Sequence, residues 1–183
     1  VAGSMMMSPN TFININGAWG GSNGTRRFSG GFTQTAGTLA VSHGGTLQFD
    51  SGLNLAAGFL LGNGNVIGDV SASGIVSPSV GSLTSSATPG QLNLTGNLTL
   101  LSTSVLLFEL GGAAQGADYD FLNVSGTAAL NGTLGLAFAN GFVATPGQTF
   151  TLLSSSSLSG AFRNVAPGGQ LFTDDGLGSF QVN

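Results

Sequence analysis

Hydrophobic and small polar residues alternate in short runs along most of the chain. Residues 46–49 read T-L-Q-F, residues 97–100 read N-L-T-L, and residues 105–110 read V-L-L-F-E-L. A period of two places side chains on opposite faces of an extended backbone, so each run predicts a β-strand. The same alternation occurs at residues 11–15, 38–41, 91–94, 121–124, 133–138, 149–153 and 180–182. None of these runs has the length or the period of a helix, so the chain is predicted to be all-β.

A degenerate repeat links several of these strands. The unit is Gly-Thr-Leu-x-hydrophobic, and it occurs at residues 37–41, 45–49 and 132–136, with a variant at 96–100. Strands this short cannot bury an apolar face alone, whereas stacking them gives each strand a neighbour and builds one continuous core. The repeat therefore predicts a β-solenoid resembling a right-handed parallel β-helix. Asn-Gly and Pro-Gly pairs between the runs supply the sharp corners.

A β-sandwich is the alternative fold, because Asn-Gly pairs between strands also favour hairpins. Composition divides the chain near residues 77–89. Residues 1–90 are rich in Gly and Ser with very short apolar runs, and residues 91–183 have longer, more apolar runs and more Phe. We expect a narrow β-repeat region over 1–90. Residues 91–183 are expected either to continue the solenoid or to form the sandwich.

Charge is sparse over the 183 residues. Charged residues make up 5% of the chain, Lys and Cys are absent, and the formal net charge is −4. Too few cations are present to neutralise a phosphate backbone, so we expect no nucleic-acid partner. The absence of Cys excludes disulfide scaffolds, thiol catalysis and Cys-based zinc sites. The most apolar stretch, residues 92–110, is interrupted by Asn, Thr, Ser and Glu109, so no transmembrane segment is predicted.

Catalytic chemistry has few candidates, because the chain holds one Glu and one His. In the run 105–110, Glu109 shares a face with Val105 and Leu107, opposite the face expected to enter the core, so we expect it to point outward near a strand end. A buried carboxyl group with a raised pKa is the alternative, and Glu109 paired with Asp118 or Asp120 is the arrangement that a glycosidase would need. We predict no enzyme, no catalytic residue and no cofactor.

Two carboxylates lie two residues apart at Asp118 and Asp120, a spacing that could chelate a structural calcium ion. The alternative is that Asp residues cap turns through the local backbone, and it applies equally to the pair at Asp174 and Asp175. His43 is expected in a solvated turn. Cations are rare, and Arg26 and Arg27 are expected either to pair with Asp residues of a neighbouring subunit or to form a surface ion pair.

Several stretches have a sequence pattern that is typical of a known class of repeat proteins. They are residues 31–39, 60–79, 92–100, 118–136 and 142–150, and the most specific piece is Y-D-F-L-N-V-S-G at 119–126. Together they resemble bacterial exported β-strand-repeat proteins, namely the passenger domains of autotransporters and exported PEP-CTERM proteins. The resemblance implies a β-solenoid that is extracellular or at the cell surface, and it supplies no catalytic residues. Because no Pro-Glu-Pro sorting signal is recognised, the resemblance leaves the mode of anchoring undefined.

These observations predict an extracellular structural protein that self-associates into a surface filament, sheath or matrix. Sparse charge removes the repulsion that keeps copies apart, and unpaired strand edges template further pairing. The alternative function is an adhesin passenger that binds glycans or other cells. Trp19 and Tyr119 are its candidate sugar-stacking side chains.

Overall fold

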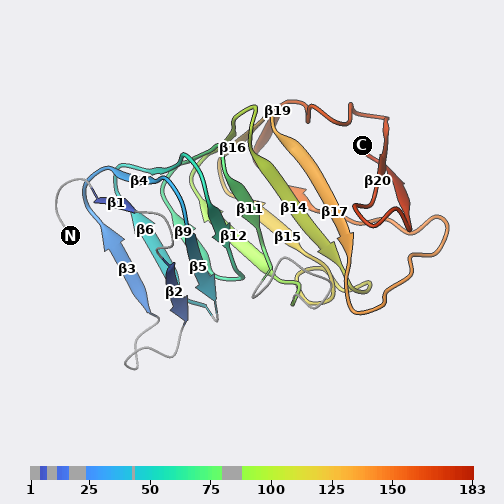
Figure 1. The fold of residues 1–183 in the computed structure, drawn as a ribbon, viewed down its shortest axis with the longest axis horizontal. Helices are drawn as coiled ribbons and strands as arrows, with labels where there is room; N and C mark the ends of the chain where they lie inside the picture. Colours follow the sequence, from blue (N-terminus) through green and yellow to red (C-terminus); the bar gives the residue numbers. More distant parts are fainter. Residues whose placement is uncertain (1–4, 8–11, 17–23, 43, 80–87) are drawn as a thin grey trace.

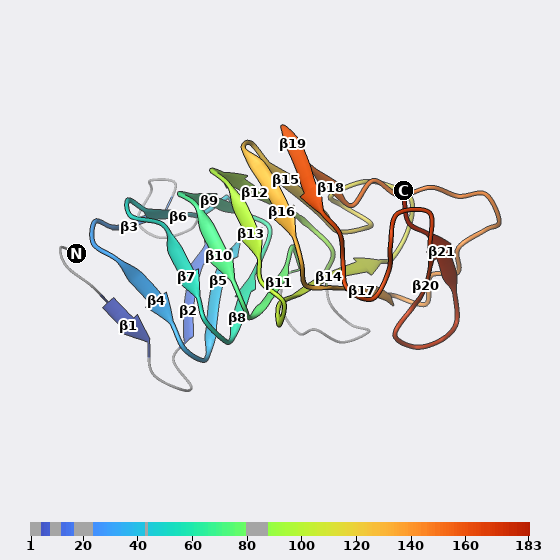
Figure 2. The same cartoon turned by 90° about the horizontal axis from the view of Figure 1, so that it is seen from above.

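The chain winds through three parallel β-sheets that form the faces of one solenoid (Figures 1 and 2). The computed structural model describes residues 5–7, 12–16, 24–42, 44–79 and 88–183. No helix occurs in these described ranges. Every third strand pairs in parallel, so each turn of the chain, or coil, contributes one strand to each sheet.

Sheet A has seven strands, and sheets B and C have six each. Sheet A consists of β1 (Met5–Met7), β4 (Phe32–Gln34), β7 (Leu53–Leu55), β10 (Val70–Ala72), β13 (Leu98–Leu100), β16 (Thr127–Leu130) and β19 (Ser157–Gly160). Sheet B consists of β2 (Phe12–Asn16), β5 (Thr38–Ser42), β8 (Phe59–Leu61), β11 (Ile75–Ser77), β14 (Val105–Leu110) and β17 (Thr133–Phe138). Sheet C consists of β3 (Thr25–Phe28), β6 (Thr46–Phe49), β9 (Asn65–Ile67), β12 (Gln91–Thr95), β15 (Phe121–Val124) and β18 (Leu153–Ser154).

The predicted solenoid is confirmed, and the sandwich alternative for residues 91–183 is wrong. The three sheets run through residue 90 without a break, because β9 pairs with β12, β10 with β13 and β11 with β14. The antiparallel pairing of named strands in the described chain is a hairpin of β20 (Gln170–Phe172) and β21 (Ser179–Gln181). Strands β7 to β11 occupy a Gly- and Ser-rich region where the alternation is too short to predict them. The strand predicted over 149–153 is mostly irregular, and only Leu153 lies in β18.

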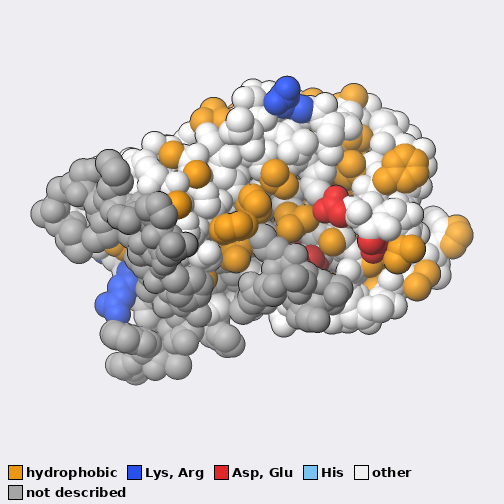
Figure 3. All heavy atoms as spheres, viewed as in Figure 1, with side chains coloured by type: hydrophobic (Ala, Val, Ile, Leu, Met, Phe, Trp, Pro, Cys, Tyr) orange, Lys and Arg blue, Asp and Glu red, His pale blue; other side chains and the backbone are white. Residues whose placement is uncertain are grey.

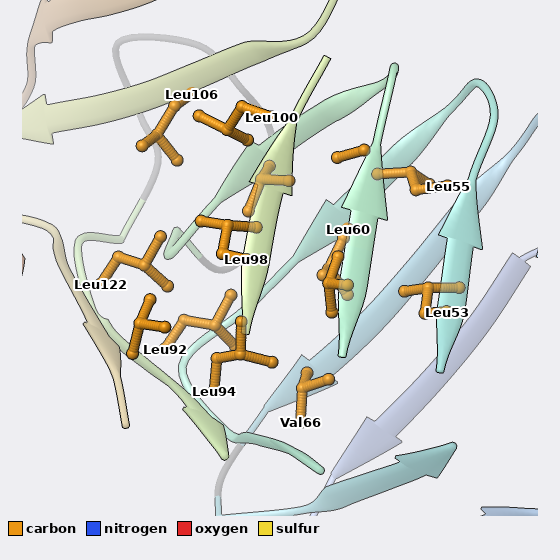
Figure 4. Close-up of a cluster of buried hydrophobic side chains, with 14 of the residues drawn as sticks. Leu53, Leu55, Leu60, Val66, Leu92, Leu94, Leu98, Leu100, Leu106 and Leu122 are labelled. Carbon is orange, nitrogen blue, oxygen red and sulfur yellow. The ribbon is translucent and has the colours of Figure 1, made fainter. Parts of the chain in front are cut away.

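Equivalent side chains stack on one another inside the solenoid (Figure 4). On sheet C, for example, Leu47, Val66, Leu94 and Val124 occupy one column in register, and each is at most 4% exposed. One apolar cluster extends from Phe28 to Leu171, so both halves of the chain share a core. Full burial of a Leu or Val side chain contributes about 1.5–3 kcal/mol, which makes these columns the main stabilising element.

Hydrogen-bonded amide side chains connect the coils on the outer face of sheet C. Asn93 donates to Asn65 Oδ1 at 3.3 Å, and Asn123 donates to Asn93 Oδ1 at 3.4 Å. At the corner before sheet A, Asn97 donates to Asp69 and accepts from Thr127. Polar side chains are thus satisfied from one coil to the next, by neutral amides on sheet C and by Asp69, Asn97 and Thr127 at the corner.

The C-terminal end of sheet B is closed by residues that follow β19. The side-chain amide of Asn164 accepts from Leu134 N at 2.9 Å and donates to Leu134 O at 2.8 Å, as a neighbouring strand would. Asp174 N also donates to Leu136 O at 2.7 Å. Val165 and Leu171 add apolar side chains to the core from the same segment. The outer edge of β17 is therefore occupied within the chain at Leu134 and Leu136.

The corner glycine Gly62 offers a test of how closely the coils stack. Its φ is 125°, and a Cβ there would lie 1.7 Å from the carbonyl oxygen of Val41 in the preceding coil. We expect Gly62→Ala to lower the free energy of unfolding by about 3 kcal/mol or more, because the backbone of one of the two coils must move. Urea denaturation followed by circular dichroism measures this change.

Gly31→Ala is the matched control, because a Cβ at Gly31 meets no atom within 4 Å. Its effect is expected to stay within about 1 kcal/mol. Equal unfolding midpoints for the two variants would contradict the close stacking described here.

Candidate functional site

Two carboxyl groups are buried together on the outer side of sheet B. Leu106, Phe108 and Leu110 of β14 enter the core, so Glu109 lies on the opposite face of the strand, as its spacing predicts. Although Glu109 lies on the outward face of the strand, its side chain is not at the surface, since the residue is only 1% exposed. The buried-carboxyl alternative is therefore the one that the structure shows.

Glu109 belongs to a hydrogen-bonded group that we call the carboxyl cluster, made of Ser77, Ser79, Glu109 and Asp120. Each of the four is at most 1% exposed. Ser79 Oγ hydrogen-bonds to Glu109 Oε2, lies 2.7 Å from Asp120 Oδ2 and lies 3.1 Å from Ser77 Oγ. One hydroxyl oxygen thus joins both carboxyl groups.

Asp120 is held by backbone groups from two other segments. Its Oδ1 accepts from Gly90 N at 2.8 Å, and its Oδ2 accepts from Glu109 N at 2.9 Å. The backbone N–H of Asp120 donates in turn to the carbonyl oxygen of Glu109 at 2.9 Å. Asp120 therefore ties the start of β15 to the end of β14 and to the residue before β12.

The hydrogen atoms available for these bonds determine the protonation state of each carboxyl group. Ser79 has a single hydroxyl hydrogen, which it can donate to only one of its two carboxyl neighbours. The other carboxyl group must then carry a proton and donate it to Ser79. Asp120 already accepts two backbone N–H bonds and is the better carboxylate, so Glu109 is the protonated member.

Burial agrees with this assignment. Removal from water raises the pKa of Glu109 to about 7, against the lowering effect of its hydrogen bond with Ser79 and with a further rise from the charge of Asp120. Burial also raises the pKa of Asp120 to about 6, opposed by the hydrogen bonds from Ser79, Gly90 and Glu109. Burial thus favours the protonated form of both groups, and the hydrogen bonds from Gly90 and Glu109 to Asp120 decide which group keeps its proton.

The two calcium candidates have different surroundings. Asp118 is exposed, and its Oδ2 accepts from Ala114 N at 3.1 Å within its own turn. Asp120 points instead into the carboxyl cluster. Across the described ranges, no three His, Cys, Asp or Glu side chains come together as metal ligands.

The remaining sequence candidates have local roles. Asp175 Oδ1 accepts from Thr173 Oγ1 and Leu177 N, which is the predicted turn-capping role. Arg27 forms a surface ion pair with Asp50 of the next coil, with 2.8 Å between Nη2 and Oδ2. The guanidinium of Arg27 lowers the pKa of Asp50. His43 and Trp19 lie outside the described residues.

Tyr119 is a correction to the sequence analysis. It is 6% exposed, and its ring packs edge-to-face against Phe150 with centroids 5.0 Å apart. A sugar-stacking side chain needs an open ring face, so the expectation for Tyr119 is wrong.

The cluster is not arranged as a glycosidase pair. Such enzymes hold two carboxyl groups about 5–10 Å apart on either side of the bond to be cleaved. Here both carboxyl groups bind the same hydroxyl oxygen, and all the side chains involved are buried. The arrangement is suited to holding a proton and joining chain segments.

Comparison with known proteins identifies no relative: no family model, no curated protein and no solved structure matches the chain. The described residues also include no helix capable of crossing a bilayer. The resemblance to exported bacterial repeat proteins stays a prediction.

Sequence reasoning identified Glu109 and Asp120 but not their partners. An isolated Glu in an apolar strand was the usable signal for a buried carboxyl group. Ser77 and Ser79 carry no comparable signal, because Ser is frequent throughout the chain. The contacts of Ser79 with Glu109 and Asp120, thirty and forty-one positions later, depend on coil length.

The assigned proton states predict opposite tolerance to amide substitution. Glu109→Gln keeps a donor toward Ser79, so its free energy of unfolding at pH 6 is expected to change by less than about 1 kcal/mol. Asp120→Asn places an NH₂ group against one of two backbone N–H donors, so that two donors face each other. It is expected to lower the free energy of unfolding by about 3 kcal/mol. Guanidinium denaturation of both variants measures the difference. A larger loss in Glu109→Gln than in Asp120→Asn would reverse the assignment.

Proposed function

We propose that this chain is an extracellular or cell-surface structural protein that self-associates as the subunit of a filament, sheath or matrix. The observation that carries the proposal is the state of strand β19 at the end of sheet A. All four of its residues are exposed. Within the described ranges, backbone hydrogen bonds reach only the edge of β19 that faces β16.

The side chain of Leu158 supports the same conclusion. Leu158 pairs with Ala128, so it continues a column of core residues along sheet A, yet it is 58% exposed. The earlier members of that column are Phe32, Leu53, Val70, Leu98 and Ala128, each at most 2% exposed. An added strand would give Leu158 the neighbour that every other member has.

Sheet B ends differently from sheet A. Asn164 and Asp174 occupy the outer edge of β17, and the segment after β19 covers the core beside it. At this end of the solenoid, the occupied edge at Leu134 and Leu136 leaves a second copy no room to stack a whole coil on sheet B. Strand addition along β19 is the mode of contact that fits this end of the solenoid.

Sparse surface charge makes contact between identical copies less costly. Figure 3 shows few Asp, Glu, Lys or Arg side chains on the face viewed, and the chain has a formal net charge of only −4. Little electrostatic repulsion then opposes association. An unpaired β-edge without charged side chains is also the kind that templates pairing.

An adhesin that binds glycans is the second candidate. A groove of about 530 Å³ runs along the outer face of sheet A, and Thr33, Asn54, Ser71 and Thr99 of successive strands line it. Aligned hydroxyl and amide groups can hydrogen-bond to a sugar chain. A glycan array probed with the purified protein tests this candidate, and the absence of any bound glycan would remove it.

Self-association is tested by a charge placed on β19. Leu158→Lys puts an ammonium group on the open edge, and we expect it to weaken self-association at least tenfold. Leu177→Lys is the matched control, since Leu177 is 80% exposed and lies on the turn after β20. Analytical ultracentrifugation over a range of concentrations and electron microscopy provide the measurement.

Two results would contradict different parts of the proposal. Wild-type protein that stays monomeric at every concentration would contradict the proposed function. Assembly that both Lys variants leave unchanged would keep the function but place the contact away from β19.

A further inference from the structure

The carboxyl cluster lies at the junction of two coils. Ser79 and Gly90 belong to the fourth coil, which contains β10 to β12, and Glu109 and Asp120 belong to the fifth, which contains β13 to β15. The bonds from Ser79 to both carboxyl groups and from Gly90 to Asp120 all cross this junction. The cluster therefore joins the two coils through side chains that can gain and lose protons.

Buried contacts at the other coil junctions come from groups that do not titrate, whereas the ion pair of Arg27 with Asp50 and the bonds from Asn97 to Asp69 lie at the surface. Backbone ladders and apolar columns connect neighbouring coils, and the neutral ladder of Asn65, Asn93 and Asn123 joins the third, fourth and fifth coils. Among the described residues, Glu109 and Asp120 are the buried carboxyl groups. The junction between the fourth and fifth coils is thus the one where protonation changes a buried contact.

We propose that the carboxyl cluster is a proton-dependent lock between the fourth and fifth coils, closed while the carboxyl pair holds a proton and loosened when that proton is lost. With one proton, Glu109 donates to Ser79, Ser79 donates to Asp120, and Asp120 accepts from Gly90 and Glu109 backbone groups. With none, two buried carboxylates share one hydroxyl hydrogen and repel each other. Water must enter or the groups must separate, because a buried charge without a partner is strongly unfavourable.

The direction of the pH effect follows from linkage. Both carboxyl groups have pKa values raised by burial, to about 7 for Glu109 and about 6 for Asp120, so the folded chain binds more protons than the unfolded chain between about pH 4 and 7. The stabilisation is therefore fully present below about pH 4 and is lost as the pH rises to about 7. The two groups titrate as a coupled pair.

Few other ionisable groups lie on the segments packed around the cluster. Asp118 and Tyr119 precede Asp120, and Asp174 lies against Gly135 of β17, the strand that pairs with β14. In the described part of the chain, none of the three side chains hydrogen-bonds to the cluster. Burial and the neighbouring charge of Asp175 raise the pKa of Asp174.

The solenoid architecture keeps the effect local. Each coil contacts only its neighbours, so a weakened junction leaves the pairing within the flanking coils in place. Loss of the proton is expected to increase local opening of residues 88–95 and 105–124. Residues 46–61, in the second and third coils, serve as an internal reference.

Hydrogen exchange of the full chain measures this opening. We compare wild-type protein at pH 5.5 and pH 8, with each rate corrected for intrinsic exchange, and expect protection of residues 88–95 and 105–124 to fall at least tenfold at pH 8. Protection of residues 46–61 is expected to change much less. Glu109→Gln cannot lose a proton, so it is expected to retain protection at pH 8.

Asp50→Asn is the matched control, because it removes a carboxyl group from the surface and should leave the pH response intact. Equal corrected protection of the junction at both pH values would overturn the proposal, as would a full pH response in Glu109→Gln. Infrared spectroscopy of wild-type protein gives an independent result if a variant fails to fold. A carboxylic-acid band at pH 6 that disappears by pH 8 supports the lock, and its absence at pH 6 overturns it.

Discussion

The structure depends on one constraint, which is that strands of two to six residues cannot bury an apolar face by themselves. Each strand gains its buried neighbours from the equivalent strand of the coil before and the coil after. Parallel stacking in register places Leu on Leu or Val, as in the column of Leu47, Val66 and Leu94. The same register places Asn on Asn outside. Close approach then demands glycine where a corner meets the backbone of the previous coil, as Gly62 shows.

Stacking also explains why a buried polar cluster can exist in this chain. A carboxyl group leaves water only if hydrogen bonds replace its hydration. The outer side of sheet B supplies them, because successive coils bring Ser79, Gly90 and Glu109 to one point around Asp120. Neutral ladders on sheet C solve the same problem without a titratable group. The junction between the fourth and fifth coils carries both kinds of contact, and the proposed pH sensitivity belongs to its carboxyl cluster.

Where the chain leaves the three sheets, the edge of sheet B at β17 is closed and the edge of sheet A at β19 is open. Asn164 imitates a neighbouring strand at Leu134, and residues after β19 fill the core beside it. No such group covers β19 within the described chain. The exposed Leu158 is the consequence, since its column continues to the last strand of sheet A and has no further member. A terminal segment thus closes part of the solenoid and leaves one edge able to pair.

Much of the local structure could be predicted from the chain itself. Alternation in residues 105–110 placed Glu109 on the face opposite Leu106 and Phe108, and the Gly-Thr-Leu repeat indicated stacked coils. Strands β7 to β11 were not predicted, because three-residue strands are too short to show a period. Residues 149–153 alternate but do not form the expected strand, and Phe150 packs against Tyr119.

The sequence by itself determined where side chains alternate, where corners fall and how little charge the surface carries, because these properties depend on neighbouring residues. Only the tertiary structure decided which residues of different coils meet. Ser79 reaches Asp120 across forty-one positions, Tyr119 is buried by a ring from a later loop, and Asn164 closes an edge formed earlier in the chain. These contacts depend on the lengths of the corners between strands, and no short-range pattern encodes how those lengths add up.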